Sequence, residues 1–359
     1  MASAIVFGGT FARAGWVLGT ARIAHRVWQI YWFHIGLFLA VFVLLAATDA
    51  AGLNPDRHHV GSLNLWNVLE EPAAALVGLA TLRWVPNYFD VLPMYLVVLA
   101  MIPVAVALAR VSPMLAVAAS ALVWLLAQRS VMGWAGLGEY QLRLPAEPWS
   151  DRTWFFNPFG WQLVFFTGFA LMRGWLPRPP VTPALIGAAV AVLLASLALS
   201  SIGFRLWELG PVKAAFVAAT GCAETGFGAC NPVFDWRQAH QLWWDKTDLS
   251  ILHYAHFVAL AYVAWALAGP DGRNLVAAGA GLWRRLRDAV VDVACVVGRQ
   301  SLAVFVLSMW LSQVAGIVLD LAGRDAGTVA LVNLGGIATL VLAALVVGWF
   351  RSQPWRAAR

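Results

Sequence analysis

The sequence predicts an all-α, polytopic helical membrane protein. Of its 359 residues, 61% are hydrophobic and 12% are charged, whereas about a quarter of the residues in soluble domains are charged. Apolar runs of about 17 to 22 residues recur along the chain, and each is long enough to cross roughly 30 Å of hydrocarbon as a helix. The 20 Trp and 19 Phe also exceed what one soluble core of this length would hold. We therefore expect about eight full transmembrane helices plus a partial N-terminal one.

The apolar runs divide the chain into elements in a simple order. The predicted spans are 28–47, 91–109, 113–128, 159–175, 183–201, 250–268, 299–318 and 328–349, preceded by a partial span at 1–12. Only a few residues, among them Arg110, Ser112 and Pro113, separate the second span from the third, which predicts a tight hairpin. No repeat of fixed period and no low-complexity linker is present, so we predict a single domain over residues 1–359.

Basic residues predict the orientation, because they concentrate in short cytoplasmic loops. With residues 13–27 assigned to the cytoplasm, every basic cluster falls on that side. The long loops 48–90, 129–158 and 202–249 and the majority of the acidic residues fall on the other. We expect a protein of the bacterial inner membrane with periplasmic large loops and a cytoplasmic C-terminus. The net charge of +6 then reflects topology, and since no nucleic-acid motif is present we expect the bilayer, not nucleic acid, as a partner.

Polar residues open the predicted span 159–175 at its periplasmic end. Asn157 is expected to cap this helix, with Pro158 at its first position, because both are favoured there. Gln162 lies a turn further in, where a membrane-embedded amide needs a partner. An interhelical hydrogen bond and a substrate contact both remain open for Gln162.

Other polar residues stand near the predicted periplasmic ends of spans. Asp90 either caps the helix that follows it or faces a cleft as an acid or base. Lys246 precedes a span in which His253 and His256, three residues apart, share one helix face. A proton-transfer or hydrogen-bonding role is expected for the two histidines. We predict no metal site, because no third ligand stands at a recognisable spacing.

Two further features concern the opposite face and the cysteines. Arg299 starts a span on the cytoplasmic side, as a topological anchor or as a phosphate contact. Cys222 and Cys230 share one predicted periplasmic loop, where a disulfide is permitted, but the sequence leaves the distance between them open. No glycine-rich phosphate loop or nucleophile elbow is present.

Five segments together make the chain resemble the OpgC family, membrane proteins that succinylate osmoregulated periplasmic glucans. They are 28-WQIYWFHI-35, 86-PNYFDVLPMY-95, 155-FFNPFGWQLVFF-166, 246-KTDL-249 with 256-HFVALAY-262, and 298-GRQSLAVF-305, in family order. The resemblance implies an integral-membrane acyltransferase with no bound cofactor. Acyl-coenzyme A, in this family succinyl-coenzyme A, is the expected cytoplasmic donor substrate, and periplasmic glucan hydroxyls are the acceptors.

With this resemblance in view, the polar residues take expected roles. The expected catalytic residues are His256, Asp90 and Lys246, and the expected substrate contacts are Asn157, Trp161, Gln162, His253 and Arg299. Arg284, Arg285 and Arg287 are further candidates for the coenzyme A phosphates.

The chain departs from the family pattern in two places. Such proteins usually begin with an additional span that carries an Arg and an Asp-His pair, whose histidine is taken as the catalytic base, and nothing here corresponds to it. We therefore expect the DNA upstream of Met1 to continue in frame and encode that span. His253 stands where the family has an Arg. The alternatives are a transporter or flippase, which predicts internal repeats and paired broken helices, and a non-catalytic relic of the family.

Overall fold

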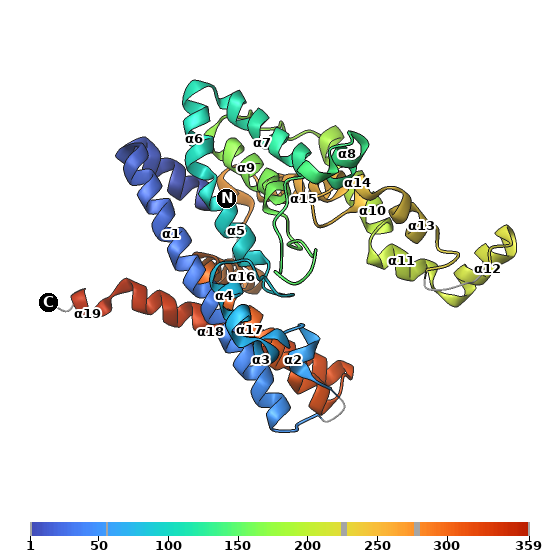
Figure 1. Cartoon of the computed structure of the whole chain (residues 1–359). Helices are drawn as coiled ribbons and strands as arrows, with labels where there is room; N and C mark the ends of the chain where they lie inside the picture. Colours follow the sequence, from blue (N-terminus) through green and yellow to red (C-terminus); the bar gives the residue numbers. More distant parts are fainter. Residues whose placement is uncertain (1, 55–56, 224–227, 276–280, 358–359) are drawn as a thin grey trace. The chain divides into compact units, whose positions relative to one another are not determined.

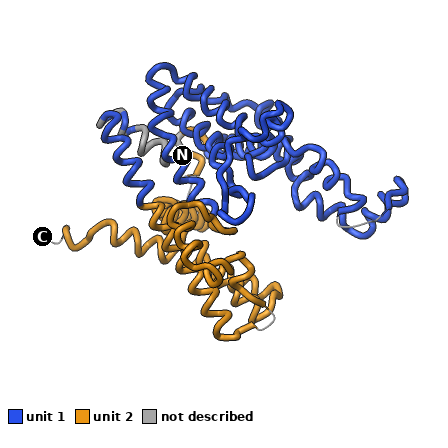
Figure 2. Tube along the Cα trace, viewed as in Figure 1, with its two compact units in different colours: residues 1–28, 90–268 blue, residues 29–89, 269–359 orange. Residues whose placement is uncertain are grey.

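The regular structure of the chain is helical (Figure 1). The computed structural model describes residues 2–54, 57–223, 228–275 and 281–357. No strand occurs in these ranges, where Pro145 and Thr153 form an isolated antiparallel bridge. The chain forms two compact units, each assembled from separate stretches (Figure 2): unit 1 from Met1–Trp28 and Asp90–Ala268, and unit 2 from Gln29–Phe89 and Gly269–Arg359. A single functional domain remains a prediction.

Unit 1 contains the start of α1 (Ala2–Ala50) and the helices from α5 to α15. These are α5 (Val91–Ala100), α6 (Ile102–Val111), α7 (Pro113–Ala127), α8 (Arg129–Trp134), α9 (Pro158–Arg173), α10 (Pro183–Ala198), α11 (Ser201–Trp207), α12 (Gly210–Thr220), α13 (Pro232–Ala239), α14 (Gln241–Trp244) and α15 (Ile251–Ala268), with a 3-10 turn η1 (Gly138–Tyr140). Helix α7 packs against α6 and α9, and α10 packs against α15. These two packed groups form the body of the unit.

Unit 2 contains the rest of α1 and the C-terminal helices. The others are α2 (His59–Ser62), α3 (Asn67–Glu70), α4 (Pro72–Ala80), α16 (Leu282–Arg299), α17 (Ser301–Ala322), α18 (Ala326–Ser352) and α19 (Pro354–Ala357), with a 3-10 turn η2 (Pro270–Leu275). Helix α18 packs against α16 and α17. Phe38 of α1 is fully buried, with its ring centroid 5.5 Å from that of Trp84 and 5.2 Å from that of Phe89. These aromatic contacts hold the loop after α4 against α1.

The eight predicted spans are all helical, but fewer of them are long enough to cross a membrane. Among the described residues five helical stretches are long and apolar enough, and a sixth results if α10 and α11, bent by 54°, form one span. Helices α7 and α9 have 15 and 16 residues, which is about 22 to 24 Å of helix against roughly 30 Å of hydrocarbon. The prediction of about eight full spans was too high, because apolar composition does not show where a helix ends.

Helix α1 corrects the expected boundary near the N-terminus. The stretch labelled α1 consists of two helices that meet at a kink at Gly15, where the backbone leaves the helical conformation at φ 77° and ψ 179°. The predicted tract 13–27 contains this break, and its residues after Gly15 belong to the same helix as the span 28–47. The tract contains no proline, and arginine favours helix. The apolar stretch Gly15–Ala50 has 36 residues, or about 54 Å, so a basic N-terminal part must extend beyond the hydrocarbon.

The predicted tight hairpin between the second and third spans is confirmed. Ser112 is extended, at φ −157° and ψ 130°, and Pro113 is the first residue of α7. The proline ring keeps the preceding residue out of the helical region. A single residue therefore separates α6 from α7.

Candidate functional site

A buried carboxylate lies at the centre of the polar groups of unit 1. Asp248 is 2% exposed, and its Oδ1 accepts a hydrogen bond from Asn157 Nδ2 over 2.8 Å. Its Oδ2 accepts from Gln141 Nε2 over 2.9 Å and from the backbone N of Arg129 over 3.4 Å. The carboxylate thus joins the start of α9, the start of α8 and the loop after η1 to the segment before α15.

The backbone around Asp248 is fixed by the same elements. Its carbonyl oxygen accepts from Gln128 Nε2 over 2.7 Å, and the carbonyl oxygen of Leu249 accepts from Trp124 Nε1 over 2.8 Å. A Cβ placed on Gly160 of α9 would lie 2.2 Å from the Asp248 carbonyl oxygen, so only glycine permits this approach. The residues that flank Asp248 are therefore held in one arrangement.

Asn157 occupies the expected N-cap of α9 and also bonds across the unit. Its Oδ1 accepts from Phe159 N over 3.2 Å, which confirms the cap. Its backbone N donates to the Thr247 carbonyl oxygen over 3.0 Å, and its Nδ2 donates to the Leu142 carbonyl oxygen over 2.7 Å. The side-chain amide of this 2% exposed residue is fully used by the protein.

Asp90 precedes α5 but does not cap it through its side chain. Instead, Oδ1 of this buried residue accepts from the backbone N of Phe155 over 3.1 Å. Of the two roles left open by the sequence, the capping role is not observed. Burial raises the pKa of the Asp90 carboxyl, although the hydrogen bond from Phe155 N acts to lower it. Burial also raises the pKa of the Asp248 carboxyl, although the hydrogen bond from Asn157 acts to lower it.

An exposed cation and three aromatic side chains lie beside this buried centre. Lys246 Nζ is 5.4 Å from the ring centroids of both Phe155 and Phe156. Trp161 meets Phe156 edge to face at 5.1 Å between centroids, and its Nε1 donates to the Lys246 carbonyl oxygen over 3.1 Å. We call Phe155, Phe156 and Trp161 the aromatic platform. Such a platform next to an ammonium group suits a polar ligand with flat apolar faces, as sugars have.

The two histidines of α15 have different environments. His253 Nδ1 lies 2.8 Å from Ser250 Oγ, and its ring centroid is 5.2 Å from that of Trp244. Arg237 covers the ring of Trp244 with its guanidinium carbon at 3.6 Å from the centroid. His256 Nδ1, in contrast, is buried and has no hydrogen-bond partner in the part of the chain that the structure describes. Its ring is therefore the one in this pair with an unfilled polar position.

Gln162 is explained by contacts between helices. This residue is 1% exposed. Its Oε1 accepts from Ser120 Oγ over 2.6 Å, and its Nε2 donates to the carbonyl oxygens of Ser120 and Phe159 over 2.8 and 3.1 Å. The structure thus supplies the interhelical bond between α7 and α9 that the sequence left as one of two possibilities.

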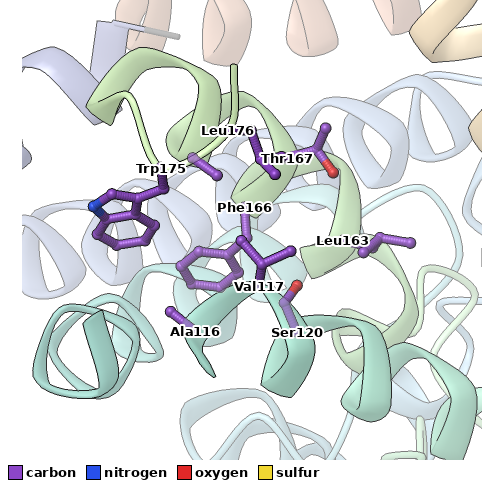
Figure 3. Close-up of a pocket in the computed structure, with 9 residues that line it drawn as sticks. Ala116, Val117, Ser120, Leu163, Phe166, Thr167, Trp175 and Leu176 are labelled. Atoms are coloured by element: carbon purple, nitrogen blue, oxygen red, sulfur yellow. The ribbon is translucent and has the colours of Figure 1, made fainter. Parts of the chain in front are cut away.

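A small cavity lies between the same two helices (Figure 3). Its lining includes Val117 and Ser120 of α7 and Leu163, Phe166 and Thr167 of α9. The cavity volume is about 20 Å³, which is room for about one water molecule. A cavity of this volume is too small for an acyl chain or a sugar.

The remaining expected contact belongs to the other unit. Arg299 is the last residue of α16 in unit 2, and its side chain is exposed. The other seven expected site residues lie in unit 1. Within the described ranges no three His, Cys, Asp or Glu residues are grouped so as to hold a metal ion.

Sequence reasoning missed Asp248 as the centre, and with it Gln128 and Gln141. All three are at most 8% exposed. A signal was present, because Gln128 directly follows the apolar run of α7 and Asp248 directly precedes that of α15. Buried polar groups are almost always hydrogen-bonded, so polar residues at span ends are candidates for mutual contacts.

The comparison with known proteins identifies one family. Residues 1–352 match the model of the family described as OpgC protein. No curated protein and no solved structure matches the chain.

Proposed function

Because the chain belongs to the OpgC family, we propose that it is an integral-membrane O-acyltransferase acting on periplasmic glucans. The acyl group is succinyl, and the donor is a coenzyme A thioester that arrives from the cytoplasm. The family match over nearly the whole chain is the observation that carries this proposal. The polar and aromatic groups of unit 1 are compatible with it, since they offer a ring nitrogen, two buried carboxylates and a cluster of aromatic rings beside an ammonium group.

The reaction is an acyl transfer from sulfur to oxygen. A glucan hydroxyl oxygen attacks the thioester carbonyl carbon, so that a C–O bond forms and the C–S bond breaks. The hydroxyl proton passes to a general base, and the coenzyme A sulfur leaves and takes up a proton as the thiol. A base therefore has to stand beside the acceptor hydroxyl with a free lone pair.

Nothing in this sequence matches the span that carries the family's base histidine, so among the described residues we propose His256 as the proton acceptor, because its Nδ1 has no hydrogen-bond partner there. Lys246 is proposed to stabilise the negative charge that develops on the carbonyl oxygen, since its ammonium group lies at an exposed position. Asp90 is proposed to hold the Phe155 side of the aromatic platform through its bond to Phe155 N. Its raised pKa also suits a proton acceptor.

The substrate contacts divide into direct and supporting ones. Trp161 and the rest of the aromatic platform are proposed to stack on sugar rings. Asn157 and His253 already have protein partners, so we propose them as positioning residues. Gln162 joins α7 to α9, so we propose a structural role for it in place of the expected substrate contact. Arg299 is proposed to contact a phosphate of the donor, because the guanidinium group suits phosphate oxygens.

Glucan analysis in cells tests this function. A strain that lacks the gene is expected to make periplasmic glucans of normal amount and backbone length with fewer anionic substituents. The wild-type gene and His240→Ala should restore the substituents, whereas His256→Ala should not. His240 is the matched control, because it is exposed and stacks on Trp236.

The same experiment separates the transporter alternative. The bend between α10 and α11 is one feature that transporters share. Loss of a transporter would lower the amount of periplasmic glucan, and loss of the acyltransferase leaves that amount unchanged. An unsubstituted but abundant glucan therefore supports the enzyme.

The orientation is also part of the proposal. Cys295 is a free, exposed cysteine on α16, whereas Cys222 and Cys230 are bonded to each other. In intact spheroplasts a membrane-impermeant maleimide is expected to leave Cys295 unlabelled, and permeabilisation should expose it. Tyr140→Cys in a Cys295→Ser background is the control, since Tyr140 is exposed in a predicted periplasmic loop. Labelling of Cys295 in intact spheroplasts would contradict the orientation.

A further inference from the structure

Helix α16 has an apolar stripe and a polar stripe on opposite faces. The apolar stripe repeats at intervals of three and four residues and consists of Leu282, Leu286, Val290, Val293 and Val297. The polar stripe has the same intervals, shifted by two positions, and consists of Arg284, Asp288, Asp292, Cys295 and Arg299. Residues at such intervals share a helix face, and a shift of two residues is a rotation of about 200°. The helix is therefore amphipathic along its whole length.

Most of the apolar stripe is exposed: of its five residues, Val297 alone is partly covered. Val290 is 68% exposed and Leu282 69%, and Trp283 beside them is 84% exposed. Helix α16 packs against α17 and α18, yet none of its residues is buried. It is also not among the helices long and apolar enough to cross a membrane in the described part of the chain. An exposed apolar face of this length marks a contact with an apolar environment. Because α16 does not qualify as a transmembrane helix, that contact must arise in another way.

The position of α16 in the chain places it at a membrane surface. The helix ends at Arg299, and the spanning helix α17 begins at Ser301, so a single residue separates them. The start of a span lies at the boundary between hydrocarbon and headgroups. Because so short a connection cannot carry the helix far, the C-terminal end of α16 lies at that boundary as well.

The charge on the helix fits phospholipid phosphates. The helix contains four arginines and two aspartates, Asp288 and Asp292, which gives 4 − 2 = +2 for the helix. Arg284 pairs with Asp288 at 3.4 Å. The positive excess is concentrated in the first two turns, close to Trp283, a residue favoured at membrane interfaces.

We propose that α16 lies in the plane of the membrane, with its apolar stripe among the acyl chains and its arginines at the phosphates of anionic phospholipids. This surface binds lipid independently of the acyl transfer. It offers these arginines an anionic partner other than the donor coenzyme A. Arg284 also pairs with Asp288, and Arg287 also donates to the carbonyl oxygens of Asn274 and Leu275. The helix would anchor unit 2 at the bilayer surface in the way of known interfacial helices.

Site-directed spin labelling of the full chain tests the placement. With Cys222 and Cys230 joined, Cys295 is the free thiol for a label on the polar stripe. Val290→Cys and Val293→Cys, each with Cys295→Ser, place a label on the apolar stripe. In nanodiscs, the ratio of collisions with oxygen to collisions with a water-soluble nickel chelate is expected to be several-fold higher at 290 and 293 than at 295. Equal ratios on the two stripes, or positions 290 and 293 closed to both reagents, would overturn the proposal.

The lipid charge is tested with the same labels. Each arginine near an anionic surface contributes about 1 kcal/mol, or about fivefold in affinity. The ratio at 290 should therefore rise when phosphatidylglycerol replaces part of the phosphatidylcholine, and Arg284→Gln with Arg285→Gln and Arg287→Gln should abolish the rise. No rise in the wild type, or a rise that free coenzyme A removes, would contradict the lipid assignment. Neither result depends on acyl transfer, so failure here is distinct from failure of the proposed function.

Discussion

The side-chain amide of Asn157 donates a hydrogen bond to Asp248 Oδ1 over 2.8 Å and so ties the N-terminus of α9 to the segment that precedes α15. Asn157 is itself the cap of α9, and Asp248 receives two further donors from Gln141 and Arg129. The chain thus uses one buried carboxylate to join elements that are far apart in the sequence. The aromatic platform and Lys246 lie together beside this junction.

Removal of the carboxylate is expected to destabilise unit 1. Asp248→Ala leaves one buried N–H of Asn157 and one of Gln141 without an acceptor, although each amide keeps its bond to a backbone carbonyl oxygen. Each such unpaired donor costs about 1 to 3 kcal/mol. Asp248→Asn should restore only part of the lost stability. Its NH2 group cannot accept a hydrogen bond from the N–H groups that now donate to one of the two carboxylate oxygens. We expect a loss of about 3 kcal/mol for Asp248→Ala, measured by thermal unfolding in detergent. Asp235→Ala, an exposed aspartate on α13, should change little, and equal melting of both variants would refute the role of the junction.

Asp90 gives a prediction on pH. Burial raises its pKa above the ordinary value of 3.8, so the folded protein holds the proton more tightly than the unfolded chain. The stability that this proton contributes is fully present below the unfolded pKa and is lost as pH rises through the folded pKa. Asp90→Asn keeps an acceptor for Phe155 N but carries no charge.

The variant is therefore expected to match the wild type near pH 4 and to be more stable than the wild type at neutral pH. Thermal unfolding over this pH range measures the difference, with the exposed Asp151→Asn as control. If Asp90 takes part in proton transfer, the stabilised variant also loses acyl transfer. A pH profile of stability that does not change on substitution would show that Asp90 does not titrate as the structure indicates.

Gln162 is expected to be structural. Gln162→Leu breaks the bonds to Ser120 and should cost about 1 kcal/mol, the usual size for a polar contact between membrane helices. In a double-mutant cycle, Gln162→Leu with Ser120→Ala should cost less than the two single changes together. Acyl transfer per folded molecule should stay near that of the wild type. A large loss of activity at normal stability would instead make Gln162 a substrate contact.

The structure forms the disulfide between Cys222 and Cys230 that the sequence left open. The bond precedes Asn231, which caps α13 and donates to Glu208 Oε1 over 2.7 Å. Closure of so short a loop contributes about 2 to 3 kcal/mol through the unfolded chain. The double change Cys222→Ser with Cys230→Ser should therefore lower the melting temperature and speed proteolysis in the 201–240 segment, while Cys295→Ser should not. Alkylation of both native thiols without a reductant would show that no disulfide forms.

Much of the fold followed from the sequence, because apolar runs, prolines and caps act locally. Pro113, Asn157 and Pro158 marked helix starts that the structure has at those positions. The number of full spans did not follow, since the lengths of α7 and α9 depend on packing and on the turns at their ends. The Asp248 junction was also missed, because it joins residues about 90 or more positions apart in pairs that no local spacing reveals.

The most direct test is acyl transfer by the purified full-length chain in nanodiscs supplied with succinyl-coenzyme A and a periplasmic glucan. Released coenzyme A thiol and new succinyl ester on the glucan are expected in equal amounts. His256→Ala should lose both products, whereas His240→Ala should retain them. A folded wild-type protein that releases thiol without forming ester, or forms neither, would contradict the account.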